Sequence, residues 1–80
     1  MVINQYDGNK ERHGMWETYF DNGKIDFRGQ YMNGFRYGFW ESFDRNGELI
    51  WSGSYVNSTR VGIWNICLMG GKLKRKEFYL

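Results

Sequence analysis

Residues 13–36 read HGMWETYFDNGKIDFRGQYMNGFR, and residues 37–60 read YGFWESFDRNGELIWSGSYVNSTR. The two stretches align without a gap, and many of their positions are identical. The identical pairs are Gly14/Gly38, Trp16/Trp40, Glu17/Glu41, Asn22/Asn46, Gly23/Gly47, Gly29/Gly53, Tyr31/Tyr55, Asn33/Asn57 and Arg36/Arg60. Self-similarity at a period of about 20 to 50 residues is typical of arrays in which one small unit stacks on the next. The sequence therefore predicts a tandem repeat protein.

The repeat continues on both sides in altered form. A third copy starts at Val61 and keeps the register through Gly62, Trp64, Gly71 and Tyr79, but it is incomplete at residue 80. Upstream, Gln5-Tyr6 resembles Gln30-Tyr31 with one inserted residue. We expect one domain over residues 1–80, divided into a degenerate half-repeat or cap at 1–12, repeats at 13–36 and 37–60, and an altered repeat at 61–80.

Composition and turn signals predict that each unit is a β-hairpin. Aromatic residues make up 20% of the chain, with 11 glycines and no proline, and this mixture favours strands and turns. Tight hairpins need backbone with positive φ, which the turn glycines Gly23, Gly47 and Gly71 can adopt. We expect strands near residues 2–6, 14–20, 25–32, 38–44, 48–56, 62–68 and 72–79. The predicted fold is all-β: a single-layer antiparallel meander of tandem hairpins with six to seven strands.

The register of the hairpins has two interpretations. A three-residue loop with a glycine bulge pairs Tyr19 near Ile25, and we prefer this longer loop. It gathers one set of residues on one face: Met15, Tyr19, Ile25, Phe27, Tyr31, Phe39, Phe43, Leu49, Trp51, Tyr55, Ile63, Cys67 and Leu73. The opposite face then carries Trp16, Trp40 and Trp64 among Thr18, Asp26, Arg28, Ser42, Ser52 and Ser54. A two-residue loop would instead place Trp16 against Gly29 and Glu17 against Arg28.

The spacing of these residues resembles the MORN repeat, in the variant common in small bacterial and phage proteins. It runs Gly14-x-Trp16-x-x-Tyr19, then Asn22-Gly23, then Gly29-x-Tyr31-x-Asn33-Gly34, and it recurs from Gly38. The resemblance implies an elongated single-layer sheet that serves protein interaction or scaffolding, with lipid contact proposed for some members and antitoxin-like roles for some bacterial relatives. Three features depart from the pattern. Ser58 replaces the glycine of the Asn-Gly link, Asn65 replaces the repeated glutamate, and the run Lys74-Arg75-Lys76 interrupts the pattern of the last hairpin.

Three tryptophans one repeat apart are the first candidate for a binding surface. Trp16, Trp40 and Trp64 either stack along the sheet over Gly29 and Gly53, or offer rigid contact area to a partner. Tryptophan, tyrosine and arginine are enriched at the residues that dominate protein interfaces. We therefore expect a partner-binding surface of Trp16, Trp40, Trp64, Arg28, Arg36 and Arg60. The expected partner is another protein, bound by a small inhibitor-like or antitoxin-like module.

The last hairpin holds the one local excess of positive charge. Residues 70–80 carry Lys72, Lys74, Arg75 and Lys76 against a single acidic residue, Glu77. Lysines commonly protect the edge strand of a sheet from unwanted pairing. The same residues could instead bind anions, and nucleic acid or acidic lipid is the alternative partner. The open end of the sheet also makes a homo-oligomer plausible as a second alternative.

The sequence offers little for catalysis. His13 is the only histidine, and Glu17 and Glu41 recur one repeat apart, where an ion pair with Arg28 explains them better than acid–base work. The single Cys67 can form no internal disulfide and supplies no zinc-ligand set. We expect no enzymatic activity, no cofactor and no metal. Without a signal-peptide pattern or a run of 18 apolar residues, we expect a cytoplasmic protein with no transmembrane segment.

Overall fold

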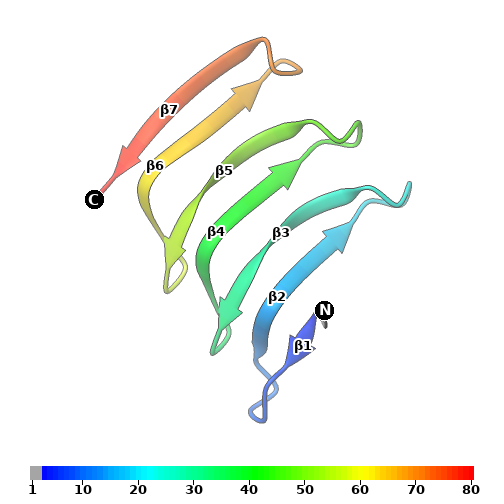
Figure 1. Ribbon diagram of the computed structural model, residues 1–80, viewed down its shortest axis with the longest axis vertical. Helices are drawn as coiled ribbons and strands as arrows, with labels where there is room; N and C mark the ends of the chain where they lie inside the picture. The colour runs from blue at the N-terminus through cyan, green and yellow to red at the C-terminus, as the bar shows by residue number, and fades with distance from the viewer. Residues whose placement is uncertain (1–2) are drawn as a thin grey trace.

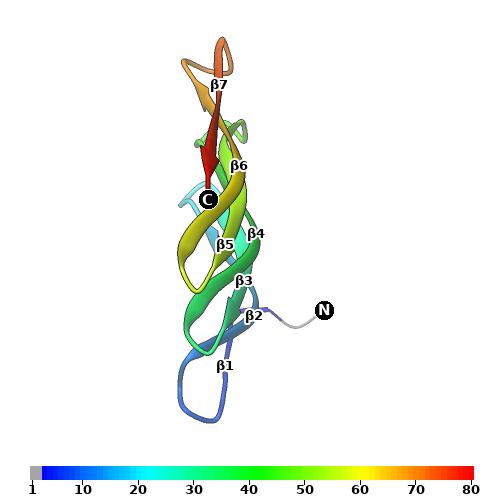
Figure 2. The same cartoon turned by 90° about the vertical axis from the view of Figure 1, so that its left-hand side faces the viewer.

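The computed structural model describes residues 3–80, which form seven antiparallel strands in one open sheet, in the order β1-β2-β3-β4-β5-β6-β7 (Figure 1). The strands are β1 (Gln5–Tyr6), β2 (Arg12–Tyr19), β3 (Ile25–Met32), β4 (Phe35–Phe43), β5 (Leu49–Val56), β6 (Thr59–Leu68) and β7 (Leu73–Tyr79). The extents are 43 × 36 × 16 Å, and the edge view shows a single twisted layer (Figure 2). The predicted all-β, single-layer meander is confirmed. The predicted first strand begins at residue 2, which lies outside the described residues.

Two kinds of turn alternate along the sheet, one at each end of the strands (Figure 1). The first hairpin, β2–β3, ends in a three-residue loop: Phe20 N–H donates to the carbonyl of Lys24 at 2.8 Å, and Gly23 has a φ of 86°. The second hairpin, β4–β5, repeats this loop with Gly47 at 87°. Links between hairpins are two-residue turns in which both residues have positive φ, such as Asn33-Gly34 at 52° and 85°. Such turns match the natural twist of the strands they join.

The third hairpin, β6–β7, departs from the other two. Its strands pair from Gly62↔Tyr79 to Leu68↔Leu73 without a register shift. The loop between them holds three consecutive residues with positive φ, Met69, Gly70 and Gly71. Because glycine adopts this backbone at little cost, Gly70-Gly71 allows the different reversal here, in which residues 69–72 connect the paired Leu68 and Leu73. The altered sequence of the last repeat thus has a different turn and an unbulged pair of strands.

The register combines features of both interpretations, and the preferred assignment of faces is partly wrong. Tyr19 pairs with Ile25, as the longer loop requires, but the register then shifts, and Trp16 pairs with Gly29. Asp26 is the extra residue of this bulge, and the second hairpin has the same shift between Ser42 and Phe43. One extra residue inverts the alternation of side chains along the rest of β3. Five residues that we expected on the opposite face therefore lie on the tryptophan face, and three that we expected on the tryptophan face lie on the opposite one. The first group is Phe27, Tyr31, Trp51, Tyr55 and Leu73, and the second is Arg28, Ser52 and Ser54.

The core of the protein belongs to a row of aromatic rings on one face, one ring from each strand, in which the five central rings are buried and Tyr6 at the first edge is 61% exposed. In strand order the row is Tyr6, Trp16, Tyr31, Trp40, Tyr55, Trp64 and Tyr79. Neighbouring rings are edge to face, with centroid distances from 5.0 Å between Tyr55 and Trp64 to 6.3 Å between Trp40 and Tyr55. Such pairs contribute about 0.5–1.5 kcal/mol each beyond the area they bury. We call this row the aromatic spine, its side of the sheet the inner face, and the other side the outer face.

Each tryptophan of the spine also contacts the preceding hairpin. A Cβ atom added to Gly29 would lie 2.1 Å from Cδ2 of Trp40, and the same distance separates an added Cβ on Gly53 from Cδ2 of Trp64. The indole N–H of Trp40 donates to the carbonyl of Gln30 at 3.1 Å. Glycine is thus required at these positions because the indole lies directly on the backbone. This contact joins one repeat to the next.

The start of the chain makes the same contacts with fewer residues. Trp16 donates its indole N–H to the carbonyl of Gln5 at 3.1 Å, and Tyr6 meets the Trp16 ring edge to face at 5.3 Å. Gln30 and Tyr31 make the equivalent contacts with Trp40. β1 therefore covers the first tryptophan with two residues, Gln5 and Tyr6.

Candidate protein-interaction surface

Burial of the tryptophans in the spine removes them from the free surface, and the outer face presents a different set of exposed apolar side chains. Trp40 and Trp64 have no exposed area, and Trp16 is 9% exposed. On the outer face, in contrast, Tyr37, Phe39, Ile63 and Phe78 are 42, 56, 57 and 70% exposed. Among residues 3–80 no second layer covers them. We call these four side chains the outer apolar row.

The bulges of the sheet explain why the outer apolar row stands out. The register shifts between Arg28 and Gln30 as β3 pairs with β4, so that Gly29 lies opposite a longer segment of β4 that contains Phe39. The same shift recurs between Ser52 and Ser54 as β5 pairs with β6, opposite Ile63. Phe39 therefore has no paired residue on β3, and Ile63 has none on β5. The neighbouring residues Trp40 and Trp64 point to the inner face and are buried, whereas Phe39 and Ile63 point to the outer face, where no side chain of the preceding strand lies opposite them.

Cross-strand neighbours connect the members of this row. Phe39 pairs with Ser54, which pairs in turn with Val61, and Ile63 pairs with Phe78. The short side chain of Ser54 leaves room for the large ones on either side. The result is a band of apolar side chains that runs across β4 to β7, perpendicular to the strands.

A polar band lies beside the outer apolar row, nearer the hairpin tips. Arg28 Nε donates to Glu41 Oε1 at 2.8 Å, which forms the cross-strand ion pair expected for this glutamate. Glu17 pairs in register with Arg28, but its carboxylate accepts a hydrogen bond from the Tyr19 hydroxyl at 2.7 Å. This bond raises the pKa of Tyr19 above its ordinary value. Both glutamates thus have partners that explain why they recur.

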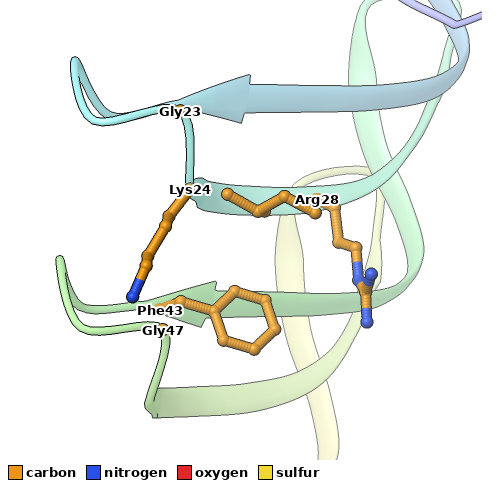
Figure 3. A pocket seen from close by; sticks show the side chains of 6 residues that line it. Gly23, Lys24, Arg28, Phe43 and Gly47 are labelled. Carbon is orange, nitrogen blue, oxygen red and sulfur yellow. The ribbon is translucent and has the colours of Figure 1, made fainter.

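A shallow hollow of about 420 Å³ lies between the tips of the first two hairpins (Figure 3). Its lining includes Lys24, Ile25, Arg28 and Phe43. Lys24 extends across it and donates from Nζ to the carbonyl of Asn46 at 3.2 Å. The cationic groups here are held by neighbouring residues, and His13 is not part of the hollow. We assign the hollow to the contact between successive hairpins.

The arginines expected at the binding surface lie in two different places. Arg28 is on the outer face in the ion pair with Glu41. Arg36 and Arg60 lie on the inner face, with their guanidinium carbons 4.8 and 4.7 Å from the ring centroids of Trp40 and Trp64. Each also donates to a tyrosine hydroxyl, Tyr55 at 3.1 Å and Tyr79 at 3.2 Å. Arg12 makes the same contacts with Trp16 and Tyr31 and completes the series.

These stacked arginines cover the spine, and their contribution can be measured. We expect Arg36→Ala to lower the free energy of unfolding by about 1–2 kcal/mol, because it removes a cation–π contact and a charge-assisted hydrogen bond. Arg45→Ala is the control, since Arg45 forms an exposed ion pair with Asp21 and lies 5.4 Å from the ring centroid of Phe20, which is outside the spine; it should cost less than about 1 kcal/mol. Urea unfolding followed by circular dichroism measures both. Equal losses would contradict a role for Arg36 in the core.

The basic residues of the last hairpin lie along the edge strand β7 and its turn. Lys74 pairs with Cys67 and Lys76 with Asn65, and both lysines are on the outer face. Arg75 is on the inner face, 3.4 Å from the carboxylate of Glu77. Lys72 is in the turn that precedes the strand. The four residues thus do not form a single cluster.

The sequence prediction did not include the outer apolar row. Phe39 and Ile63 occupy the position of Met15 in the repeat, and all three are apolar. That agreement was a usable signal, but we assigned these residues to a face shared with Tyr31 and Tyr55. Once the bulge separates the two groups, the tyrosines are in the core and Phe39 and Ile63 are exposed.

Comparison with protein-family models, with curated proteins and with solved structures finds no match for this chain. The resemblance to MORN repeats therefore stays a prediction. Within residues 3–80 there is no helix that could cross a membrane. In the same part of the chain, no three His, Cys, Asp or Glu side chains are grouped as metal ligands would be.

Proposed function

We propose that this protein is a non-catalytic interaction module that binds another protein through its outer apolar row. The observation that carries the proposal is the exposure of Tyr37, Phe39, Ile63 and Phe78, each above 40%, on one face of a single-layer sheet. Aromatic side chains are enriched at protein interfaces, and those near the centre commonly act as anchors. An apolar patch of several hundred Å² on a monomer commonly marks a partner site.

The dimensions of the sheet fit this role. A standard interface covers about 800 Å² on each partner, and the broad face of a sheet of 43 × 36 Å provides that area. The polar band with Arg28 and Glu41 borders the apolar row, as the polar rim borders the core of many interfaces. A module of this size would act by covering part of its partner's surface, as small inhibitors and antitoxins do. A scaffold made of several copies of the chain is the second candidate.

Site-specific crosslinking tests the proposal. We expect a photoreactive amino acid at position 39, in the native cell, to give a discrete adduct with another protein. The same group at Met69, which is 74% exposed in the last turn, serves as the control and should give none. The captured protein is then produced separately, and its affinity is measured for the wild type, Phe39→Ser and Met69→Ser.

Phe39→Ser should weaken the complex by about 30-fold or more, which corresponds to a hot-spot loss of 2 kcal/mol, while Met69→Ser should change the affinity less than about twofold. Circular dichroism first establishes that both variants are folded. An adduct between two copies of the chain would assign the scaffold role instead. Identical adducts at both positions, or an affinity unchanged by Phe39→Ser, would contradict binding through the outer apolar row.

A further inference from the structure

The two edges of the sheet are closed in different ways. At the first edge, Asn4 covers the backbone of β2 beyond the short strand β1. Its side chain donates from Nδ2 to the carbonyl of Glu17 at 2.9 Å and accepts from the N–H of Glu17 at 2.7 Å. Its own N–H donates to the carbonyl of Met15 at 2.8 Å. The side-chain amide of Asn4 thus forms the two hydrogen bonds with Glu17 that one residue of an added strand would form, and it occupies this part of the edge.

At the other edge, β7 is long and pairs on one side only. It spans Leu73–Tyr79, and among residues 3–80 its only partner is β6. In an antiparallel ladder, alternate residues direct their backbone N–H and C=O groups away from the neighbouring strand. This edge therefore presents a row of donors and acceptors in the geometry that another strand would need.

The charge of β7 defines which strand it can accept. Arg75 is neutralised by Glu77, whereas Lys74 and Lys76 are exposed on the outer face and form no ion pair within the described residues. A hollow of about 360 Å³ lies next to them, lined also by Asn65, Ile66 and Cys67. Opposite charges across two strands stabilise their pairing, and like charges destabilise it.

We propose that the edge of β7 binds an extended acidic segment of another protein as an eighth strand of the sheet. Carboxylates at alternate positions of that segment would face Lys74 and Lys76 on the outer face. Main-chain hydrogen bonds would provide most of the affinity, and the two lysines would select an acidic sequence. The site adjoins the outer apolar row at Phe78, which lies on β7, but the pairing uses the backbone of β7 and does not require the row to bind a partner.

The same features disfavour the other occupants. A second copy paired through β7 would bring its lysines next to Lys74 and Lys76. Pairing of β7 with the first edge of a second copy is disfavoured because Asn4 already occupies the backbone groups of Met15 and Glu17 at that edge. Nucleic acid would use the lysines but would leave the row of backbone donors and acceptors unpaired. Binding to nucleic acid also benefits from a continuous basic groove, which two lysines beside a neutralised arginine do not form.

Titration with short labelled peptides tests the proposal. The probe is a fluorescein-labelled peptide of alternating glutamate and threonine, long enough to pair with all of β7. The comparisons are the same peptide with N-methylated backbone at alternate residues, the alternating lysine–threonine peptide, and a single-stranded DNA of equal charge. We expect saturable binding of the acidic peptide alone, with slowed amide exchange along residues 73–79 and not along β2.

Protein variants locate the binding site. Lys74→Glu with Lys76→Glu should weaken binding of the acidic peptide by more than 10-fold. Lys10→Glu with Lys24→Glu changes the net charge equally, at a distance from β7, and should weaken it less than threefold. Phe39→Ser should leave it unchanged, which separates this edge from the outer apolar row.

The proposal is overturned by any of three results. The first is no saturable binding of the acidic peptide below about 1 mM. The second is equal binding of the N-methylated peptide, which would show attraction of charge without strand pairing. The third is tighter binding of the DNA, which would assign the edge to nucleic acid.

Discussion

Trp40→Ala is expected to lower the free energy of unfolding by about 3–5 kcal/mol, the usual cost of removing a fully buried tryptophan. A domain of this length commonly has a total stability of about 4–12 kcal/mol, so the loss is a large fraction of the total. Trp40 lies in the middle of the aromatic spine, with Tyr31 and Tyr55 at centroid distances of 5.1 and 6.3 Å. Its removal also leaves the carbonyl of Gln30 without the indole donor.

Urea unfolding followed by circular dichroism measures this loss. Phe39→Ala is the matched control, because it removes a large aromatic side chain from the neighbouring position of the same strand. Phe39 is 56% exposed, and its loss should cost less than about 1 kcal/mol. Trp40→Phe keeps the aromatic contacts and should cost less than alanine does. Equal costs for Trp40→Ala and Phe39→Ala would contradict the burial of the spine.

Gly53→Ala is expected to destabilise the protein by about 2–4 kcal/mol, although it adds a single methyl group. The new Cβ would lie 2.1 Å from Cδ2 of Trp64, which is fully buried, so the indole or the backbone must shift. Overpacking of a close-packed core costs typically about 1–3 kcal/mol and sometimes more. The backbone of Gly53 does not have positive φ, so the loss reports the clash with the indole and not backbone strain.

Other glycines provide controls for this prediction. Gly8→Ala meets no atom within 4 Å and no positive φ, and should change the stability by less than about 0.5 kcal/mol. Gly62→Ala also has open space, but Gly62 has a φ of +72°, so a loss of about 1–2 kcal/mol from backbone strain is expected. The order Gly53, Gly62, Gly8 in thermal or urea unfolding is the expected result. A Gly53→Ala variant as stable as Gly8→Ala would show that the indole does not lie on this glycine.

Local sequence features were sufficient to predict the repeat and its hairpins. Gly23 and Gly47 signalled tight hairpin turns, although two loop lengths stayed open, and the equal spacing of Trp16, Trp40 and Trp64 offered indoles over Gly29 and Gly53 as one of two alternatives. These features depend on contacts within one unit or between two neighbouring units. The sequence repeats them, so they can be recognised without a structure.

The assignment of faces could not be derived in the same way. Asp26 looks like any other strand residue in the sequence, but as the extra residue of a bulge it moves Phe27 and Tyr31 to the face of Trp16. A bulge of this kind depends on how the whole hairpin closes and on which side chains it can bury. The outer apolar row was missed for this reason. Phe39 and Tyr55 are both aromatic, and only the register shows that the first is exposed and the second buried.

The central claim is that the tryptophans form the core while the apolar residues of the outer face remain free. Hydroxyl-radical footprinting with mass spectrometry tests it most directly, because it reports the exposure of many side chains in one experiment. Tryptophan reacts intrinsically faster than phenylalanine, so that burial must reverse the natural order. We expect oxidation at Phe39 and Phe78, with Met69 as an exposed reference, and strong protection of Trp40 and Trp64 until the protein is unfolded in urea. Oxidation of Trp40 and Trp64 ahead of Phe39 and Phe78 in the folded protein would contradict the account.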